Sequence, residues 1–365
     1  MKKRIIFYGV LSLPAVLMGI VVLVTALDIV QVRMIDQSTL YTGFRDHLLH
    51  KGPASFPLPE GIQERHPLKK TVFVFGESSL VLSDGKTFPD YLGSAHEGLQ
   101  VVNFGVTGID SLSVLQRVQE ALAASVPDIM ILYYGHNDYN NAYHGYLVPQ
   151  YFERFNLLLR IPYLFYDKTR PVSAFSFGTF YWYGEMHRPR LYQLFEKAKL
   201  VDIHSASYAP VNGLILEYFM HHNEAIIRLA ASRNVPVVLI TPVGNLRAEP
   251  YGDLNATTGA YRKGMETADY QQSIAYLKQA RDSEIFTYDV RAKSGLVDYI
   301  RHFKRSGVYV LDLEKELETK QFGFGYSDFL DYFHFNDRSH RLLADMIYDF
   351  LKQKNLVRPV RSISK

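Results

Sequence analysis

Three side chains in this sequence are of the types that carry out nucleophilic catalysis. Ser78 follows a Gly-Glu dipeptide, and Asp331 precedes His334 by three residues near the C-terminus. A serine hydroxyl needs a neighbouring base to act as a nucleophile, and His334 could accept its proton and later return it to a leaving group. Asp331 could hold the other ring N–H of the histidine and stabilise the imidazolium. These residue types predict acyl transfer through Ser78.

The same chemistry requires hydrogen-bond donors for the oxyanion that develops on the substrate. The candidates are the backbone N–H groups of Ser78 and Gly105 and the side-chain amide of Asn137. Glycine at position 105 allows a close backbone approach, and Ser78 is expected to open a helix with an electropositive N-terminus. Ser79 is the neighbouring candidate nucleophile. Each residue alone would fit a cap or a turn, so the prediction depends on their joint occurrence.

Regular elements must bring these distant residues together. Five short apolar runs predict strands at 71–75, 99–104, 128–134, 235–241 and 308–312. Helical spacing predicts helices at 111–124, 218–232, 270–280 and 341–351. Apolar runs without alternation, separated by helices, are typical of a parallel sheet that is covered on both faces. Ligands bind beyond the carboxyl ends of such strands, and Ser78, Gly105 and Asn137 follow the first three runs.

Four motifs in this order resemble the SGNH (GDSL-like) hydrolase superfamily over about residues 71–352. They are the serine after the first strand, the glycine after the second, the Gly-x-Asn-Asp turn after the third, and the Asp-x-x-His pair. The resemblance implies an α/β fold of three layers, α/β/α, with a five-stranded flavodoxin-like parallel sheet. It also implies a Ser78–Asp331–His334 triad and an oxyanion hole of Ser78, Gly105 and Asn137. Glu77 departs from the family, which usually has aspartate there.

The N-terminus has the pattern of a membrane anchor. Residues 5–27 carry no charge over 23 positions, and three basic residues, Lys2, Lys3 and Arg4, precede them. A helix of that length crosses a bilayer, and the basic residues favour a cytoplasmic N-terminus with an exported body. The alternative is a cleaved signal peptide that ends at Val24-Thr25-Ala26, although signal peptides usually have shorter apolar cores. We therefore expect an uncleaved, single-pass bacterial inner-membrane protein with a periplasmic catalytic domain.

The remaining sequence divides around the predicted catalytic domain. We expect a membrane segment at 1–32, a juxtamembrane stalk at 33–70, the catalytic domain at 71–352 and a basic tail at 353–365. An insert at about 139–215 is rich in aromatic residues and contains the only tryptophan, Trp182. The insert could be an accessory subdomain, a lid or groove for sugar or acyl chains, or a surface on the bilayer. Asn245 and Arg247 follow the fourth strand and, like Trp182, are candidate substrate contacts.

Composition excludes several other classes of function. The chain has no cysteine, so thiolate nucleophiles, disulfides and iron–sulfur clusters are excluded. His221 and His222 are adjacent and would point apart on a helix, and we expect neither a metal nor a cofactor. The chain has a net charge of +3, and its two ends together carry eight positive charges. Residues 5–351 therefore have a net charge of −5. A mildly acidic body argues against nucleic-acid binding.

These observations and the resemblance together imply a membrane-anchored serine esterase or O-acyltransferase. The expected substrate is an ester, with O-acyl groups on exported polysaccharide favoured by the resemblance. The expected partners are a cell-surface glycan, the bilayer through residues 5–27 and a membrane acyl-donor protein. The alternatives are a lipid esterase or thioesterase, and a non-catalytic membrane-complex subunit that retains the fold.

Overall fold

The computed structural model describes residues 19, 56–59, 62–142, 209–250, 256–284 and 291–357. By internal contacts the chain forms two compact units, one of residues 1–47 and 144–207 and one of residues 48–143 and 208–365. Apart from residue 19, all described residues belong to the second unit. The predicted membrane segment, most of the aromatic insert and most of the basic tail lie outside the described residues. Within the described residues, no helix has the length and apolar character needed to cross a bilayer.

The centre of the second unit is a sheet of five parallel strands in the order β2-β1-β3-β4-β5. The strands are β1 (Lys70–Gly76), β2 (Leu99–Asn103), β3 (Ile129–Tyr133), β4 (Val237–Ile240) and β5 (Val308–Leu311). This order is that of the flavodoxin-like doubly wound fold, which confirms the predicted α/β class and five-stranded parallel sheet. The chain order reverses at β1, which lies between β2 and β3.

The central strand β1 is apolar on both faces because helices cover both. Val72 and Val74 point to one face of the sheet and belong to a large buried core, which also contains Phe88 from a helix on that face. Phe73 and Phe75 point to the opposite face, where both rings contact Phe104. A run without polar alternation is therefore what a strand in this position requires.

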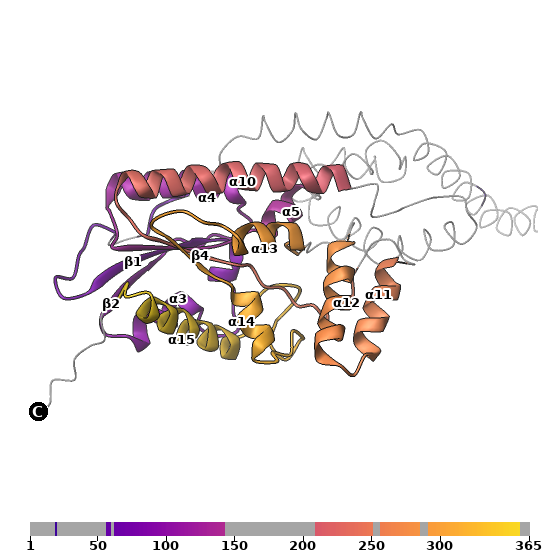
Figure 1. Cartoon of the computed structure of the whole chain (residues 1–365). Helices are drawn as coiled ribbons and strands as arrows, with labels where there is room; N and C mark the ends of the chain where they lie inside the picture. The colour runs from indigo at the N-terminus through magenta and orange to yellow at the C-terminus, as the bar shows by residue number, and fades with distance from the viewer. Residues whose placement is uncertain are drawn as a thin grey trace, which may run out of the picture. The chain divides into compact units, whose positions relative to one another are not determined.

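Two groups of helices cover the two faces of the sheet (Figure 1). One face carries α4 (Ser111–Ala124), α5 (His136–Ala142), α10 (Ala209–Ser232) and α13 (Ser294–Arg301). The other carries α3 (Phe88–Ala95), α14 (Leu313–Thr319) and α15 (Asp337–Gln353). Helices α11 (Ala256–Glu266) and α12 (Tyr270–Asp282) pack against each other.

The helices that the sequence predicted are present, with differences at their ends. Helix α4 has the predicted bounds, whereas α15 begins at Asp337 because Asn336 caps it by accepting the Ser339 N–H. Ser78 opens a helix as expected, but this is a 3₁₀ helix of a single turn, Ser78–Leu80, so its dipole is correspondingly small. The next helix, α3, starts only at Phe88 after a capping box formed by Thr87 and Asp90.

The carboxyl ends of the three strands β2, β1 and β3 lie side by side. Gly76 at the end of β1 is in register with Tyr133 at the end of β3. On the other side, Val106 N–H donates to the Gly76 carbonyl oxygen. The segments that follow these strands therefore leave the sheet from one edge, as expected for Ser78, Gly105 and Asn137.

The close approach of β1 and β3 leaves no room for a side chain at Gly76, so we expect a substitution there to destabilise the fold. A Cβ atom there would lie 2.1 Å from the Tyr133 carbonyl oxygen, a backbone atom that cannot move aside cheaply. Gly76→Ala should therefore destabilise the fold by about 1–3 kcal/mol or more, as measured by urea unfolding. Gly213→Ala is the control, since a Cβ at this helical glycine meets nothing within 4 Å. It should be neutral or stabilising, and equal stability of the two variants would contradict the prediction.

Candidate active site

A continuous chain of hydrogen bonds joins the three predicted catalytic side chains. His334 Nε2 lies 2.7 Å from Ser78 Oγ, and His334 Nδ1 lies 2.6 Å from Asp331 Oδ2. With Nδ1 carrying its proton toward the carboxylate, Nε2 is left to accept the serine proton. Ser78 and His334 are buried, whereas Asp331 is partly exposed. The pair that would exchange the proton is therefore largely shielded from water.

The Asp331 carboxylate also fixes the backbone of its own loop. Its Oδ1 accepts the N–H groups of Phe333 at 3.0 Å and of His334 at 2.9 Å. Burial alone would raise the pKa of Asp331, but the hydrogen bonds from His334 and Phe333 outweigh it and hold that pKa below its usual value. The carboxylate stays ionised, as an orienting partner of an imidazolium must.

The two neighbouring serines have different surroundings. Ser78 Oγ contacts the imidazole, whereas Ser79 Oγ is fully buried and has no hydrogen-bond partner among the described residues. The geometry therefore favours Ser78 as the nucleophile over Ser79.

The three predicted oxyanion donors are not equivalent. The Asn137 side-chain nitrogen is buried and has no hydrogen-bond partner within the described part of the chain. The Gly105 N–H, in contrast, already donates to Asn103 Oδ1 at 2.9 Å, and Asn103 Nδ2 donates to the Leu80 carbonyl oxygen at 2.8 Å. The sequence did not single out Asn103. Its side chain competes with a substrate oxygen for the Gly105 N–H, whereas no described residue competes for the side-chain amide of Asn137.

The requirement for glycine at position 105 has a packing cause. A Cβ atom there would lie 2.4 Å from the Cβ of Leu80, which is on the turn that follows the nucleophile. Glycine therefore lets the loop after β2 approach the Ser78 turn, as the sequence suggested, even though its N–H has another acceptor.

Asn245 and Arg247, predicted as substrate contacts, both make hydrogen bonds within the protein. Asn245 is fully buried, its Nδ2 donates to the Asp331 carbonyl oxygen at 2.9 Å, and its Oδ1 accepts the Arg247 N–H at 3.1 Å. Arg247 Nε donates to the Gly323 carbonyl oxygen at 2.9 Å. This geometry gives Asn245 the role of supporting the loop that carries the acid and the base. The third candidate, Trp182, lies outside the described residues.

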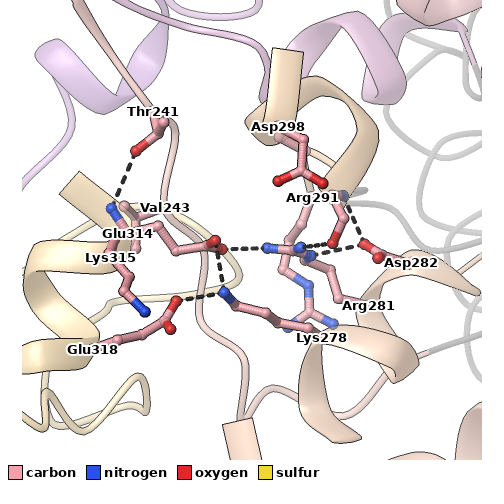
Figure 2. Close-up of polar contacts among 12 residues, drawn as sticks. Thr241, Val243, Lys278, Arg281, Asp282, Arg291, Asp298, Glu314, Lys315 and Glu318 are labelled. Carbon is pink, nitrogen blue, oxygen red and sulfur yellow. Dashed lines mark hydrogen bonds and ion pairs between the residues drawn. The ribbon is translucent and has the colours of Figure 1, made fainter. Parts of the chain in front are cut away.

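Charged side chains, most of them buried, form a set of ion pairs around Arg281 and Glu314 (Figure 2). Arg291 forms an ion pair with Glu284 and donates to the Asn245 carbonyl oxygen, so it reaches the Asp331 loop through one residue. Glu314 accepts from Lys278 at 2.8 Å and from Arg281 at 2.7 Å. Burial would raise the pKa of Glu314, but these two cations lower it to about 2.

His136, which the sequence analysis did not single out, connects two parts of the site. Its ring stacks on that of Phe333 with centroids 4.7 Å apart, and its Nδ1 accepts the Ala292 N–H at 3.0 Å. Burial is the main cause that lowers the pKa of His136 to about 3, so the ring is neutral at physiological pH. Its place between Gly135 and Asn137 was the only signal in the sequence.

No group of three or more histidine, cysteine, aspartate or glutamate side chains in the described ranges could hold a metal ion.

Comparisons with known proteins point to one family. Residues 71–161 match the family described as GDSL-like Lipase/Acylhydrolase. The match spans roughly a quarter of the chain and includes Ser78, Gly105 and Asn137, but neither Asp331 nor His334. It supports a relationship with the GDSL-like lipase/acylhydrolase (SGNH) family. A search of curated proteins gave no significant match.

Several solved structures are similar at low sequence identity. A lipase/acylhydrolase from Enterococcus faecalis is 15% identical with a TM-score of 0.33, over 80% of this chain and 100% of that one. A G-D-S-L lipolytic protein from Veillonella parvula is 12% identical with a TM-score of 0.35, over 78% and 98%. An acetyl xylan esterase is 13% identical with a TM-score of 0.38, over 76% and 98%. Similarities at this level assign no function.

The buried, neutral His136 predicts how stability depends on pH. Below pH 6.5 the unfolded chain binds a proton on this histidine, while the folded protein does not until about pH 3. Acidification through this window therefore favours unfolding, by up to about 1.4 kcal/mol per pH unit. His136→Asn keeps an acceptor for the Ala292 N–H and should remove up to about 2 kcal/mol of the loss between pH 7 and pH 5. Urea unfolding at both pH values measures this.

The control for that measurement is His221→Asn on α10, where the histidine is exposed. It should leave the pH dependence of the wild type unchanged. If His136→Asn and His221→Asn lose stability on acidification as steeply as the wild type, His136 is not the buried neutral group described here.

Proposed function

We propose that this protein is a serine esterase or acylhydrolase that works through an acyl-enzyme. The observation that carries the proposal is the hydrogen-bonded chain from Asp331 through His334 to Ser78. The buried amide of Asn137, which has no hydrogen-bond partner among the described residues, follows the neighbouring strand β3. The match of residues 71–161 to the GDSL-like lipase/acylhydrolase family supports the same class of reaction.

The geometry implies the order of steps. Ser78 Oγ attacks the carbonyl carbon of the ester while its proton passes to His334 Nε2, and the Ser78 N–H and the Asn137 amide bind the oxyanion. Collapse of the tetrahedral intermediate expels the alcohol, which takes the proton from His334. The hydroxyl group of a water or alcohol molecule, activated by the same imidazole, then attacks the acyl-serine and releases Ser78. With water the reaction is hydrolysis, and with another alcohol it is transfer.

The finer proposal is a membrane-anchored enzyme that acts on O-acyl groups of exported polysaccharide. It is supported by the uncharged segment 5–27 with its preceding basic residues, and by an acyl-enzyme that could pass its group to a sugar hydroxyl. A lipid esterase or thioesterase would use the same residues. A non-catalytic subunit would have no need for an aligned serine, histidine and carboxylate, and we do not favour it.

The nucleophile can be tested directly with a fluorophosphonate probe on detergent-solubilised protein. Ser78→Ala should abolish labelling, whereas Ser79→Ala should retain it, because His334 contacts Ser78 Oγ and no described residue is hydrogen-bonded to Ser79 Oγ. His334→Ala should slow labelling on the order of 10³-fold, since only oxyanion and binding effects remain. Labelling that disappears in the Ser79 variant and persists in the Ser78 variant would overturn the assignment.

The location of the protein gives a second test of the finer proposal. The full chain should stay with the membrane fraction after alkaline carbonate washing, and a protease added to spheroplasts should digest the catalytic domain. Release by carbonate, or a mature N-terminus at Leu27, would contradict the anchor. Turnover of esters with increasing acyl length, with and without an added sugar acceptor, separates glycan acyl transfer from lipid hydrolysis.

A further inference from the structure

Glu77 connects the nucleophile to the N-terminus of α5, the helix that follows β3. It lies between the last residue of β1 and Ser78, and its side chain crosses to the neighbouring strand end. Oε1 accepts the His136 N–H and Oε2 accepts the Asn137 N–H, each at 2.8 Å. Both carboxyl oxygens therefore have a backbone donor, and the side chain is completely buried.

The residue held in this way carries an unused donor. Asn137 Nδ2 is buried without a hydrogen-bond partner among the described residues, although buried polar groups in proteins are nearly always paired. Because Glu77 is covalently next to Ser78, the Asn137 backbone is fixed one residue from the nucleophile. This amide, on a residue whose backbone is tied to the neighbour of the nucleophile, is therefore a candidate donor to a substrate oxyanion.

A buried carboxyl group in this place is costly to maintain. Burial raises the pKa of Glu77 from 4.5 to about 8, and the Asn137 N–H only partly counteracts this, while Asp138 nearby raises the pKa further. Apolar residues would fill the space at lower cost in solvation, since isolated buried polar groups destabilise a fold. The cost of burying the Glu77 carboxyl group is offset if the N–H groups of His136 and Asn137 need an acceptor that also sets their direction.

We propose that Glu77 is a positioning residue for the oxyanion hole, acting through Asn137. Its carboxyl group holds the backbone of His136 and Asn137 so that the Asn137 amide stays directed at the reacting oxygen. The inference rests on the proposed esterase function. It assigns a task to the position at which this chain departs from the aspartate usual in the related family.

A double-mutant cycle tests the proposal with a soluble short-chain ester as substrate. Glu77→Gln keeps the shape of the side chain but turns one acceptor into a donor that faces an N–H group. It should lower kcat about 10–100-fold with less than a threefold change in KM. Asn137→Ala should lower kcat about 10²–10³-fold, as loss of one oxyanion donor does. In the Asn137→Ala background, adding Glu77→Gln should lower kcat by less than about a further threefold.

The matched control is Glu318→Gln, a buried glutamate on α14 that forms an ion pair with Lys278 on α12 (Figure 2). Its effect on kcat should be small and the same with or without Asn137→Ala, because independent sites are additive. If Glu77→Gln lowers kcat by the same factor in the wild-type protein and in Asn137→Ala, Glu77 has a general structural role and the proposal is wrong.

A second measurement does not depend on activity. Hydrogen exchange of the His136 and Asn137 amides should be slow in the wild type and faster in Glu77→Gln, with the β-strand amides unchanged. Unchanged exchange at both amides would contradict the proposal even if the esterase function holds. Inactive wild-type protein with this exchange pattern would instead count against the proposed function. If Glu77→Gln does not fold, Glu77→Asp, which is one methylene shorter, enters the same cycle with the same criteria.

Discussion

The parallel pairing of β1 with β3 is the constraint on which the site depends. Register brings Gly76 opposite Tyr133, so the chain leaves both strands at the same level of the sheet. Only a residue without a Cβ fits at position 76, because the Tyr133 carbonyl oxygen occupies that space. This close contact places Glu77 within reach of the backbone after β3, and it brings together two segments about 60 residues apart in the sequence.

The acid and the base come from a different part of the chain and need separate support. The loop of Asp331 and His334 is held from within by the Asp331 carboxylate and from behind by Asn245, whose carbonyl oxygen binds Arg291. Arg291 is buried with Glu284, and removing one partner of such a pair typically costs about 3–5 kcal/mol. The buried charges thus tie the position of the histidine to the packing of the helical layer behind it.

The donors of the site illustrate how neighbouring acceptors decide the use of an N–H group. Gly105 follows the edge strand β2 and Asn137 follows the central strand β3, and the sequence made them equivalent candidates. Asn103 accepts the N–H of Gly105, whereas Glu77 accepts the backbone N–H of Asn137. The side-chain amide of Asn137 has no partner in the described part of the chain. Which of these N–H groups already has an acceptor depends on which side chain reaches it. Neither contact corresponds to a sequence motif.

Much of the fold could be predicted because its signals are local. Apolar runs such as that of β1, the spacing of α4 and the glycines after the strands act through nearest neighbours in the chain, so periodicity predicts them. Short helices such as α13 and α14, and the single turn at Ser78, were missed or misjudged because tertiary contacts set their ends.

By itself, the sequence determined the α/β class, the succession of strands and the residue types that could act on an ester. The tertiary structure alone decided that Asn245 supports the Asp331 loop, that His136 stacks on Phe333, and that Glu77 holds Asn137. These contacts join side chains tens to hundreds of residues apart, and their geometry follows from the register of strands and the packing of layers. No local pattern encodes such distances, because each depends on the whole chain between the partners.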